Sequence, residues 1–180
     1  MFLDLKFHDI PSTVEKSCRA VTAHRIAMLT VHASGGPQML RAAVEGRGGS
    51  GLKLLAVTVL TNFDANDLRE MGIQRSVGDL VAARAALAAE VGCDGVVASG
   101  EEPAAIRGSV GDRLLIVTPG IRPSGKGVDD HARPTTPTQS IKAGSDYLVV
   151  GRPIRDAADP NDAVEAIVAE MQAAFDARKN

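Results

Sequence analysis

Short apolar runs alternate with amphipathic stretches along the whole chain, which predicts strands that alternate with helices. The runs are rich in Val, Ile and Leu and are bounded by Gly, Pro or polar residues, as is typical of strands. Because most of them are continuously apolar, they indicate parallel strands that are covered on both faces. The expected strands span residues 2–8, 26–32, 54–60, 95–99, 114–118 and 147–150.

Helices are expected between these strands, and several of their ends carry recognisable signals. Ser12 and Glu15 fit a capping box, in which two side chains satisfy free N–H groups of the first turn. Gly92 is placed to end the helix that Ser76 begins, and Pro160 suits the first turn of the last helix. The expected helices start at residue 12, span about 38–45, 76–91, 101–108 and 138–143, and start again at residue 160.

The helical periodicity also predicts which side chains face the core. The first helix places Val14, Cys18 and Val21 on one face. The helix from Ser76 is expected to bury Leu80, Ala83, Leu87 and Val91, and the last helix Val164, Ile167, Val168, Met171 and Phe175.

Six strand–helix units indicate an α/β fold, and two architectures of this class compete. A doubly wound sheet is complete with six strands, whereas a (β/α)8 barrel usually needs about 250 residues. The first strand decides between them. Side chains alternate along a strand, so Asp4 and Lys6 share one face. That face suits a barrel interior near its catalytic rim; a solvated surface is the alternative. We therefore predict one partial (β/α)8 barrel domain, residues 1–180, without its first two βα units.

The composition narrows the possible functions. With 44% hydrophobic residues, 23% charged residues and a net charge of −2, the chain resembles an ordinary soluble protein. Aromatic residues make up only 3%, which argues against a nucleic-acid binder. Cys18 and Cys93 lie in apolar segments, which predicts reduced core residues of a cytoplasmic protein. The sequence shows no metal-binding motif, membrane span or signal peptide.

Polar residues follow several predicted strands, at the end where barrel active sites lie. Arg122 follows the fifth strand and Arg152 the sixth, each near a glycine. The loops after the last two strands of a barrel often bind phosphate, and a guanidinium holds phosphate through two parallel hydrogen bonds. Phosphate binding is therefore predicted for this pair. Asp9, Thr13 and Thr61 also lie near strand ends, but threonine hydroxyls satisfy nearby backbone equally well.

Residues 119–137 form a long Gly- and Pro-rich stretch after the fifth strand. A loop of this length in a compact domain is typical of a lid over a site. Lys126 lies between two glycines, but the spacing and the following Ser or Thr of a P-loop are missing.

Five blocks of the chain, in the same order, resemble the signature of orotidine 5'-phosphate decarboxylases. The first and most specific is Phe-Leu-Asp-Leu-Lys-Phe-His-Asp-Ile-Pro at residues 2–11. The resemblance covers essentially all 180 residues. It implies a (β/α)8 barrel that forms a homodimer and converts orotidine 5'-phosphate to UMP in pyrimidine synthesis, without a cofactor. The other blocks are residues 31–36, 57–61, 117–123 and 149–153.

The resemblance also implies roles for residues near the first block. Lys6 would protonate C6 of the pyrimidine as carbon dioxide leaves, while Asp4 would lie near the substrate carboxylate and hold Lys6 in place. Asp9 and Thr13 would reach across the dimer interface into the partner's site. General chemistry agrees, because a carboxylate beside the substrate carboxylate destabilises the ground state. An ammonium stabilises a developing carbanion.

The later blocks would hold the rest of the nucleotide. Arg122, Gly151 and Arg152 would bind the phosphate. His131 occupies the position at which many family members carry a phosphate-contacting Gln. The remaining implied substrate contacts are Ile10, Thr61 and Pro119.

The chain departs from the family at its front. Family members carry an earlier strand with an Asp and another with a Lys, both lining the site. We therefore expect a fragment, an incomplete gene model or a degenerate copy, with little or no decarboxylase activity as an isolated chain. Two alternatives stay open. One is a truncated remnant that binds a nucleotide or a partner without catalysis, and the other is a magnesium-dependent phosphosugar decarboxylase or synthase of the same barrel group.

Overall fold

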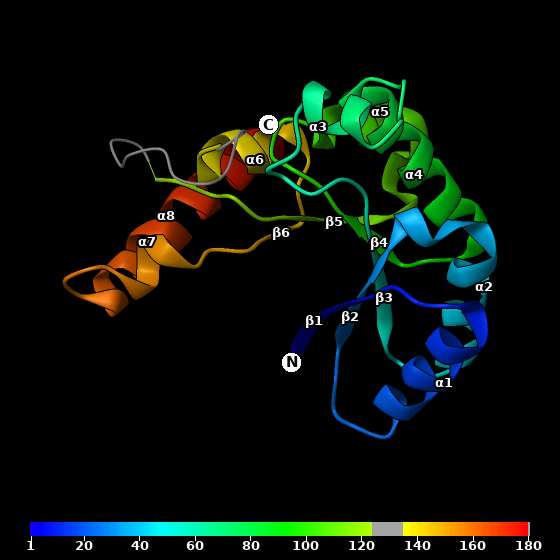
Figure 1. The fold of residues 1–180 in the computed structure, drawn as a ribbon. Coiled ribbons are helices and arrows are strands. Elements are labelled where there is room, and N and C mark those ends of the chain that lie inside the picture. The colour runs from blue at the N-terminus through cyan, green and yellow to red at the C-terminus, as the bar shows by residue number, and fades with distance from the viewer. Residues whose placement is uncertain (124–134, 180) are drawn as a thin grey trace.

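The computed structural model describes residues 1–123 and 135–179, in which six strands form one parallel sheet. Each strand lies beside the next one in the sequence, and the sheet curls with its helices on the outside (Figure 1). A doubly wound sheet would instead reverse its strand order at a switch point. The predicted partial barrel is therefore confirmed. The strands are β1 (Phe2–Phe7), β2 (Met28–His32), β3 (Lys53–Val57), β4 (Gly95–Val97), β5 (Leu115–Thr118) and β6 (Tyr147–Leu148).

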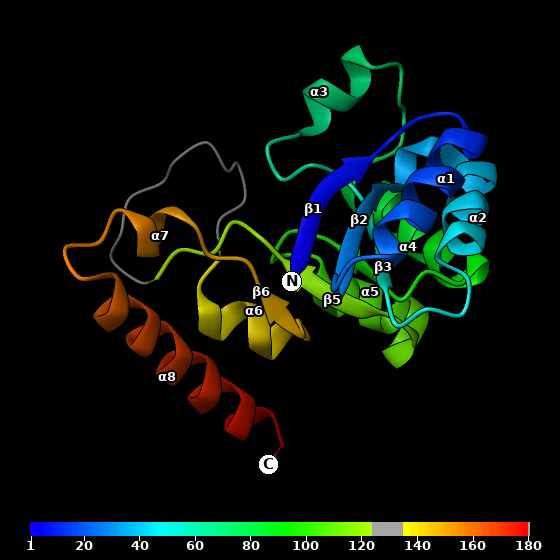
Figure 2. The same cartoon turned by 90° about the horizontal axis from the view of Figure 1, so that it is seen from below.

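The barrel wall is open, because β1 and β6 are the two edges of the described sheet. Figure 2 shows the two edges from below. Phe2, Tyr147 and Val149 help to line a shallow pocket between them, and all three side chains are exposed. Six strands are two fewer than the eight of a closed barrel. Exposed edges of this kind can pair with other chains.

Eight α-helices lie in the described residues, and several of the predicted signals hold. The Ser76 hydroxyl accepts from the N–H of Asp79 at 3.1 Å, and Gly92 ends the same helix with a φ of 89°. Pro160 begins the last helix as predicted, and the Asp159 carboxylate caps it. The helices are α1 (Pro11–Thr22), α2 (Gly36–Arg47), α3 (Ala65–Glu70), α4 (Val77–Val91), α5 (Pro103–Val110), α6 (Pro137–Ala143), α7 (Arg152–Arg155) and α8 (Pro160–Lys179), with short 3-10 turns at Ala33–Gly35 and Gly111–Arg113.

The predicted capping box of the first helix is wrong. Pro11 occupies the first helical position and Ile10 is the cap, without a side-chain hydrogen bond. Ser12 therefore lies inside the first turn, and Glu15 pairs with Arg19 one turn further on. A proline suits the first position because its missing N–H has no partner there in any case.

Two helices, α3 and α7, were not predicted, since each is too short to show helical periodicity. Asp64 caps α3 by accepting from the N–H groups of Asn66 and Asp67. The α7 helix has only four residues, directly after Gly151.

The core lies between the sheet and its helices. The predicted inward face of α1 is confirmed, whereas the predicted inward faces of α4 and α8 are only partly correct. Val14, Cys18 and Val21 are buried. In α4 the buried residues are Leu80, Val81, Ala85 and Ala88, because α2 and α5 both pack against this helix and shift its inner face. Among the residues of α8 whose burial is described, only Ile167 and Ala174 are buried, while Val164 and Val168 are 39% and 57% exposed and Met171 and Phe175 are partly buried. This helix packs mainly on α6 and α7, at the outer margin of the molecule (Figure 2).

Side chains of β3 alternate between two layers. Leu54 and Ala56 belong to the large core under the helices, whereas Leu55 and Val57 belong to a small cluster inside the curl. The inner face of the sheet is therefore packed with apolar side chains, as in a barrel.

The same arrangement of an aspartate and an arginine, here called a clamp, occurs twice at the N-terminal ends of the strands. Asp146, just before β6, accepts from the N–H of Ile116 at 2.8 Å and from Arg107 at 2.6 Å. Asp94, just before β4, likewise accepts from the N–H of Leu54 and from Arg47. Each clamp joins a strand, the helix before it and the start of the next strand.

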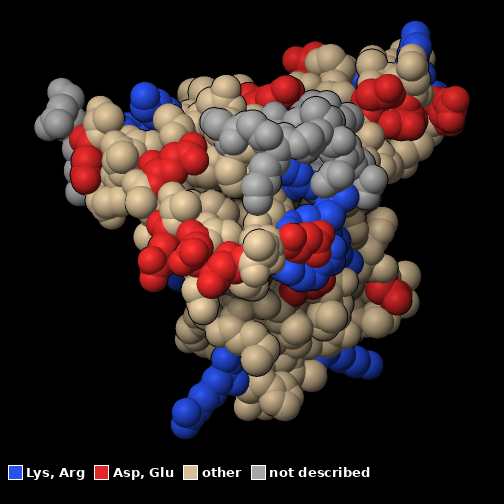
Figure 3. All heavy atoms as spheres, turned by 90° about the vertical axis from the view of Figure 1, so that its left-hand side faces the viewer, with Lys and Arg blue, Asp and Glu red and all other residues tan. Residues whose placement is uncertain are grey.

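Charged side chains of both signs lie interspersed on the face seen in Figure 3. This mixture agrees with the small net charge of −2. Among the described residues, no helix is long and apolar enough to cross a membrane.

Candidate active site

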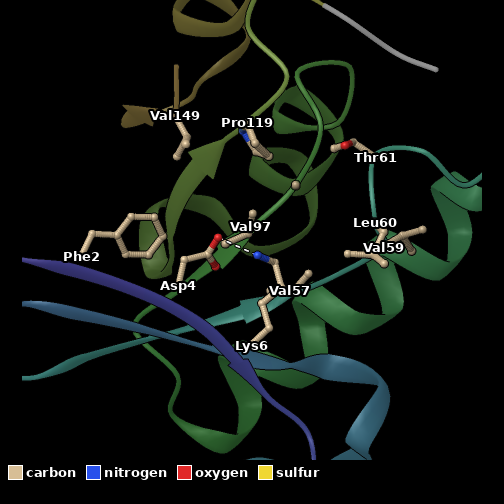
Figure 4. A pocket seen from close by; sticks show the side chains of 11 residues that line it. Phe2, Asp4, Lys6, Val57, Val59, Leu60, Thr61, Val97, Pro119 and Val149 are labelled. Carbon is tan, nitrogen blue, oxygen red and sulfur yellow. Dashed lines mark hydrogen bonds and ion pairs between the residues drawn. The ribbon is translucent and has the colours of Figure 1, made fainter. Parts of the chain in front are cut away.

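A pocket of about 180 Å³ opens at the upper ends of the strands, where the sequence placed the site. Ligand pockets are usually about 300–1,000 Å³, so this pocket is small for a complete nucleotide site. Figure 4 shows Asp4 and Lys6 rising from β1 into it. The lining residues are Phe2, Asp4, Lys6, Val57, Val59, Leu60, Thr61, Val97, Ala98, Pro119 and Val149.

Asp4 and Lys6 form an ion pair in this pocket, as their shared strand face predicts. Lys6 Nζ donates to Asp4 Oδ2 at 2.6 Å. The two side chains are 36% (Lys6) and 46% (Asp4) exposed, and such an exposed pair adds little to stability. The pair faces the pocket rather than an outer surface, so its placement suits chemistry better than structural support.

Thr30 of β2 joins this pair from below, although the sequence analysis did not single it out. Its hydroxyl donates to Asp4 Oδ1 at 2.8 Å and accepts from the backbone N–H of Lys6 at 2.9 Å. The signal was present in the sequence, because Thr30 is a polar residue inside the apolar run of a buried strand.

The other candidates near β1 do not line this pocket. Asp9 and Ile10 lie in a second, open hollow with His8 and Pro11. The Asp9 carboxylate accepts from the N–H of Ile10 at 2.6 Å, and Ile10 is 65% exposed. Thr13 is exposed on α1.

His8, which lines the second hollow, lies beside His32. The rings of His8 and His32 are 5.3 Å apart and tilted against each other. Burial lowers the pKa of His32, and the nearby His8, Lys6 and Arg84 lower it further, while Asp4 opposes them. The neutral imidazole of His32 is thus favoured beside the cationic Lys6.

The two arginines predicted to bind phosphate come shortly after residues that line the pocket, Arg122 in a loop and Arg152 at the start of α7. Pro119 and Val149 line the pocket, and Arg122 and Arg152 each come three residues later. Arg122 is only 9% exposed and donates Nη1 to the carbonyl oxygen of Ile121 at 2.8 Å.

Glycines precede both arginines but differ in conformation. Gly120 has a φ of +78°, which favours glycine. Gly151 is exposed, and a side chain at that position would meet open space. Its glycine character is therefore not required by the packing of the described residues.

Two further predictions lie outside the described residues, namely the role of His131 and the lid around Lys126. Within the described part of the chain, no group of three or more His, Cys, Asp and Glu residues could hold a metal ion.

The curled parallel sheet agrees with comparisons to known proteins. A sequence model described as the orotidine 5'-phosphate decarboxylase / HUMPS family matches residues 1–167. The chain belongs to this family. Family membership confirms the predicted resemblance, and the relatives below are named as enzymes.

Curated relatives in this family are similar over nearly the whole chain. Orotidine 5'-phosphate decarboxylase of Rhodopseudomonas palustris (strain HaA2) is 53% identical over 171 residues, which are 95% of this chain and 72% of the relative. The enzyme of the same name from Afipia carboxidovorans is 52% identical, over 97% of this chain and 73% of the relative. The crystal structure of orotidine 5'-phosphate decarboxylase from Lactobacillus acidophilus matches with a TM-score of 0.82 at 41% identity, covering 94% of this chain and 74% of that one.

Proposed function

We propose that this chain is the part of an orotidine 5'-phosphate decarboxylase that carries the catalytic lysine, and that this enzyme is cytoplasmic and forms UMP. The observation that supports this most strongly is the Asp4–Lys6 pair, which faces a pocket at the upper end of the barrel wall. Family membership and relatives with this name at about 52% identity support the same reaction.

In this proposal the Lys6 ammonium is the acid of the reaction. As the bond between C6 and the carboxylate breaks, negative charge develops on C6, and a cation beside it stabilises the transition state. Lys6 then delivers its proton to C6. Asp4 lies beside Lys6 and keeps its amine directed into the pocket.

Asp4 has a second role in the proposal. A substrate carboxylate that enters the pocket meets the Asp4 carboxylate, and two like charges at close range raise the energy of the bound substrate. Loss of carbon dioxide relieves this repulsion. Binding energy from a remote part of the substrate can offset the strain.

Arg122 and Arg152 supply that remote binding in the proposal, by holding the phosphate. Both follow strands whose ends line the pocket. Arginine suits this role because its planar guanidinium pairs with two phosphate oxygens at once. Thr61 and Pro119, which line the pocket, would contact the nucleotide between its pyrimidine and its phosphate.

The isolated chain of 180 residues is nevertheless expected to have little or no turnover. Its barrel wall is open between β1 and β6, and the pocket is small. The proposal further includes a homodimer in which Asp9 and Thr13 reach the partner's site, which fits their positions on an exposed face outside the pocket.

A chimera tests the proposal without this obstacle. In it, the present chain replaces the matched 171-residue stretch of the R. palustris (strain HaA2) relative. Loss of orotidine 5'-phosphate absorbance is then measured for the chimera, for its Lys6→Ala variant and for the isolated chain. Lys6-dependent turnover by the chimera is expected.

A folded chimera without turnover would overturn the proposal. Turnover of a phosphosugar that requires magnesium would favour the alternative enzyme of the same barrel group instead. Family-like turnover by the isolated chain would refute the expectation that the open barrel is inactive.

A further inference from the structure

The pairing of β1 with β2 is interrupted beside the candidate active site. Leu3 pairs with Leu29, and Phe7 with Val31. Between these pairs, three residues of β1 lie opposite Thr30 alone. Bulges of this kind are common next to active sites, where they redirect side chains.

The backbone inside the bulge adopts an unusual conformation. Lys6 has a φ of +51°, and it is the one non-glycine residue with a positive φ among those described. Side chains with a Cβ rarely adopt this region, and it persists where the surroundings hold it in place.

The Thr30 hydroxyl is in a position to hold it. Thr30 is fully buried, and its one oxygen accepts from the Lys6 N–H while its proton goes to Asp4 Oδ1. A hydroxyl can donate and accept at the same time. Lys6 Nζ donates to the other carboxylate oxygen of Asp4. The Thr30 hydroxyl, the Asp4 carboxylate, and the amine and backbone N–H of Lys6 therefore form one closed ring.

We propose that Thr30 is a positioning residue for the Asp4–Lys6 pair. The catalytic purpose of the pair rests on the proposed function, whereas its geometry does not. An exposed ion pair by itself is loosely ordered. The buried hydroxyl connects both members to the rigid strand β2, so it fixes the direction of the Lys6 amine.

A second buried threonine offers a matched control. Thr118 of β5 is also fully buried, and its hydroxyl is 2.7 Å from the Ser145 hydroxyl. Removing either threonine hydroxyl leaves its hydrogen-bond partner without that bond, which destabilises the fold. Only Thr30 bonds to the ion pair, so only its loss should affect Lys6 specifically.

The test is amide hydrogen exchange of the 180-residue chain, followed by NMR at the Lys6 N–H. This amide is expected to be protected in the unmodified chain. In Thr30→Val its exchange should rise at least about tenfold relative to the amides of β3. Thr30→Ser, which keeps the hydroxyl, should stay within about threefold, and Thr118→Val should leave the ratio unchanged.

Several outcomes would overturn the proposal. One is an unprotected Lys6 amide in the unmodified chain. This measurement needs no variant, so it tests the proposal even if Thr30→Val fails to fold. Another is a uniform rise across all strands in Thr30→Val, which would show only general loss of stability. A loss of Lys6 protection in Thr30→Ser would do the same.

Kinetics of the chimera add a readout that a purely structural role would not produce. Thr30→Val should lower kcat with little change in KM, and Thr30→Ser should restore most of it. A Thr30→Val chimera with unchanged kcat would overturn the role in positioning. If the unmodified chimera is inactive, the proposed decarboxylase function fails, while the exchange ratio at Lys6 still decides the role of Thr30.

Discussion

Removal of the Asp146 carboxylate should destabilise the part of the sheet that carries both arginines predicted to bind phosphate. Asp146 accepts from the N–H of Ile116 at 2.8 Å and from Arg107 at 2.6 Å. These bonds connect the base of β5 to the base of β6. Arg122 follows the first of these strands, and Arg152 follows the second.

The size of the effect follows from which groups lose a partner. In Asp146→Ala the N–H of Ile116, a fully buried residue, loses its acceptor, which costs about 1–3 kcal/mol. Arg107 keeps its bonds to the carbonyl oxygens of Gly144 and Leu114. The Asp146 side chain is 29% exposed, so water partly replaces it, and we expect a loss of about 2 kcal/mol. For a chain of this length that lowers Tm by about 4–8 °C.

Thermal unfolding followed by circular dichroism measures this change, and the same arginine supplies the control. Asp112 also lies near Arg107, at 3.7 Å, but its side chain is fully exposed. Asp112→Ala should therefore leave Tm unchanged, and Asp146→Asn, which keeps one acceptor, should fall between the two. A Tm of Asp146→Ala equal to that of Asp112→Ala would refute the reasoning.

Three further predictions concern the site and the core. In the chimera, Lys6→Ala should lower kcat at least about 100-fold while phosphate-dependent binding persists; unchanged turnover would contradict the acid role. Arg122→Ala should raise KM about tenfold or more and Arg122→Lys should recover only part of the loss, whereas equal KM values for all three chains would exclude phosphate binding there. Burial raises the pKa of Cys18 to about 11 and of Cys93 to about 12, from an ordinary 9.0. The native state therefore retains these protons longer, so the stability they contribute is complete below pH 9 and is lost as the pH rises toward 11–12. Above pH 9, unfolding free energy should fall more steeply in the natural chain than in a Cys18→Ala/Cys93→Ala variant, and equal slopes would count against buried thiols.

Much of the fold could be predicted because its signals are local. Continuous apolar runs mark most of the strands, and Ser76 and Gly92 mark the ends of α4 through hydrogen bonds and a backbone angle within a few residues. The first helix shows where local signals conflict. Ser12 and Glu15 match a capping box, but Pro11 has the stronger preference for the first helical position.

Burial was predicted less well, because it depends on neighbouring elements. Val168 has the spacing of a core residue, yet it is 57% exposed because α8 packs mainly on α6 and α7. Likewise α4 buries Val81 and Ala85 rather than Ala83, since two helices share its inner face.

The site divides in the same way. The sequence by itself predicted a shared face for Asp4 and Lys6, because side chains alternate along a regular strand. It also placed Thr61 and Pro119 after predicted strands, and both line the same pocket.

Only the tertiary structure decided how that pair is held. The bulge is defined by the pairing of β1 with β2 on either side of it. A local sequence pattern contains no information about which residues of two strands pair. Thr30 is 24 residues from Lys6 in the sequence, yet their hydrogen bond is 2.9 Å long. The sequence therefore predicted that Asp4 and Lys6 face the pocket, and the contact between the two strands decided the direction in which the Lys6 amine points.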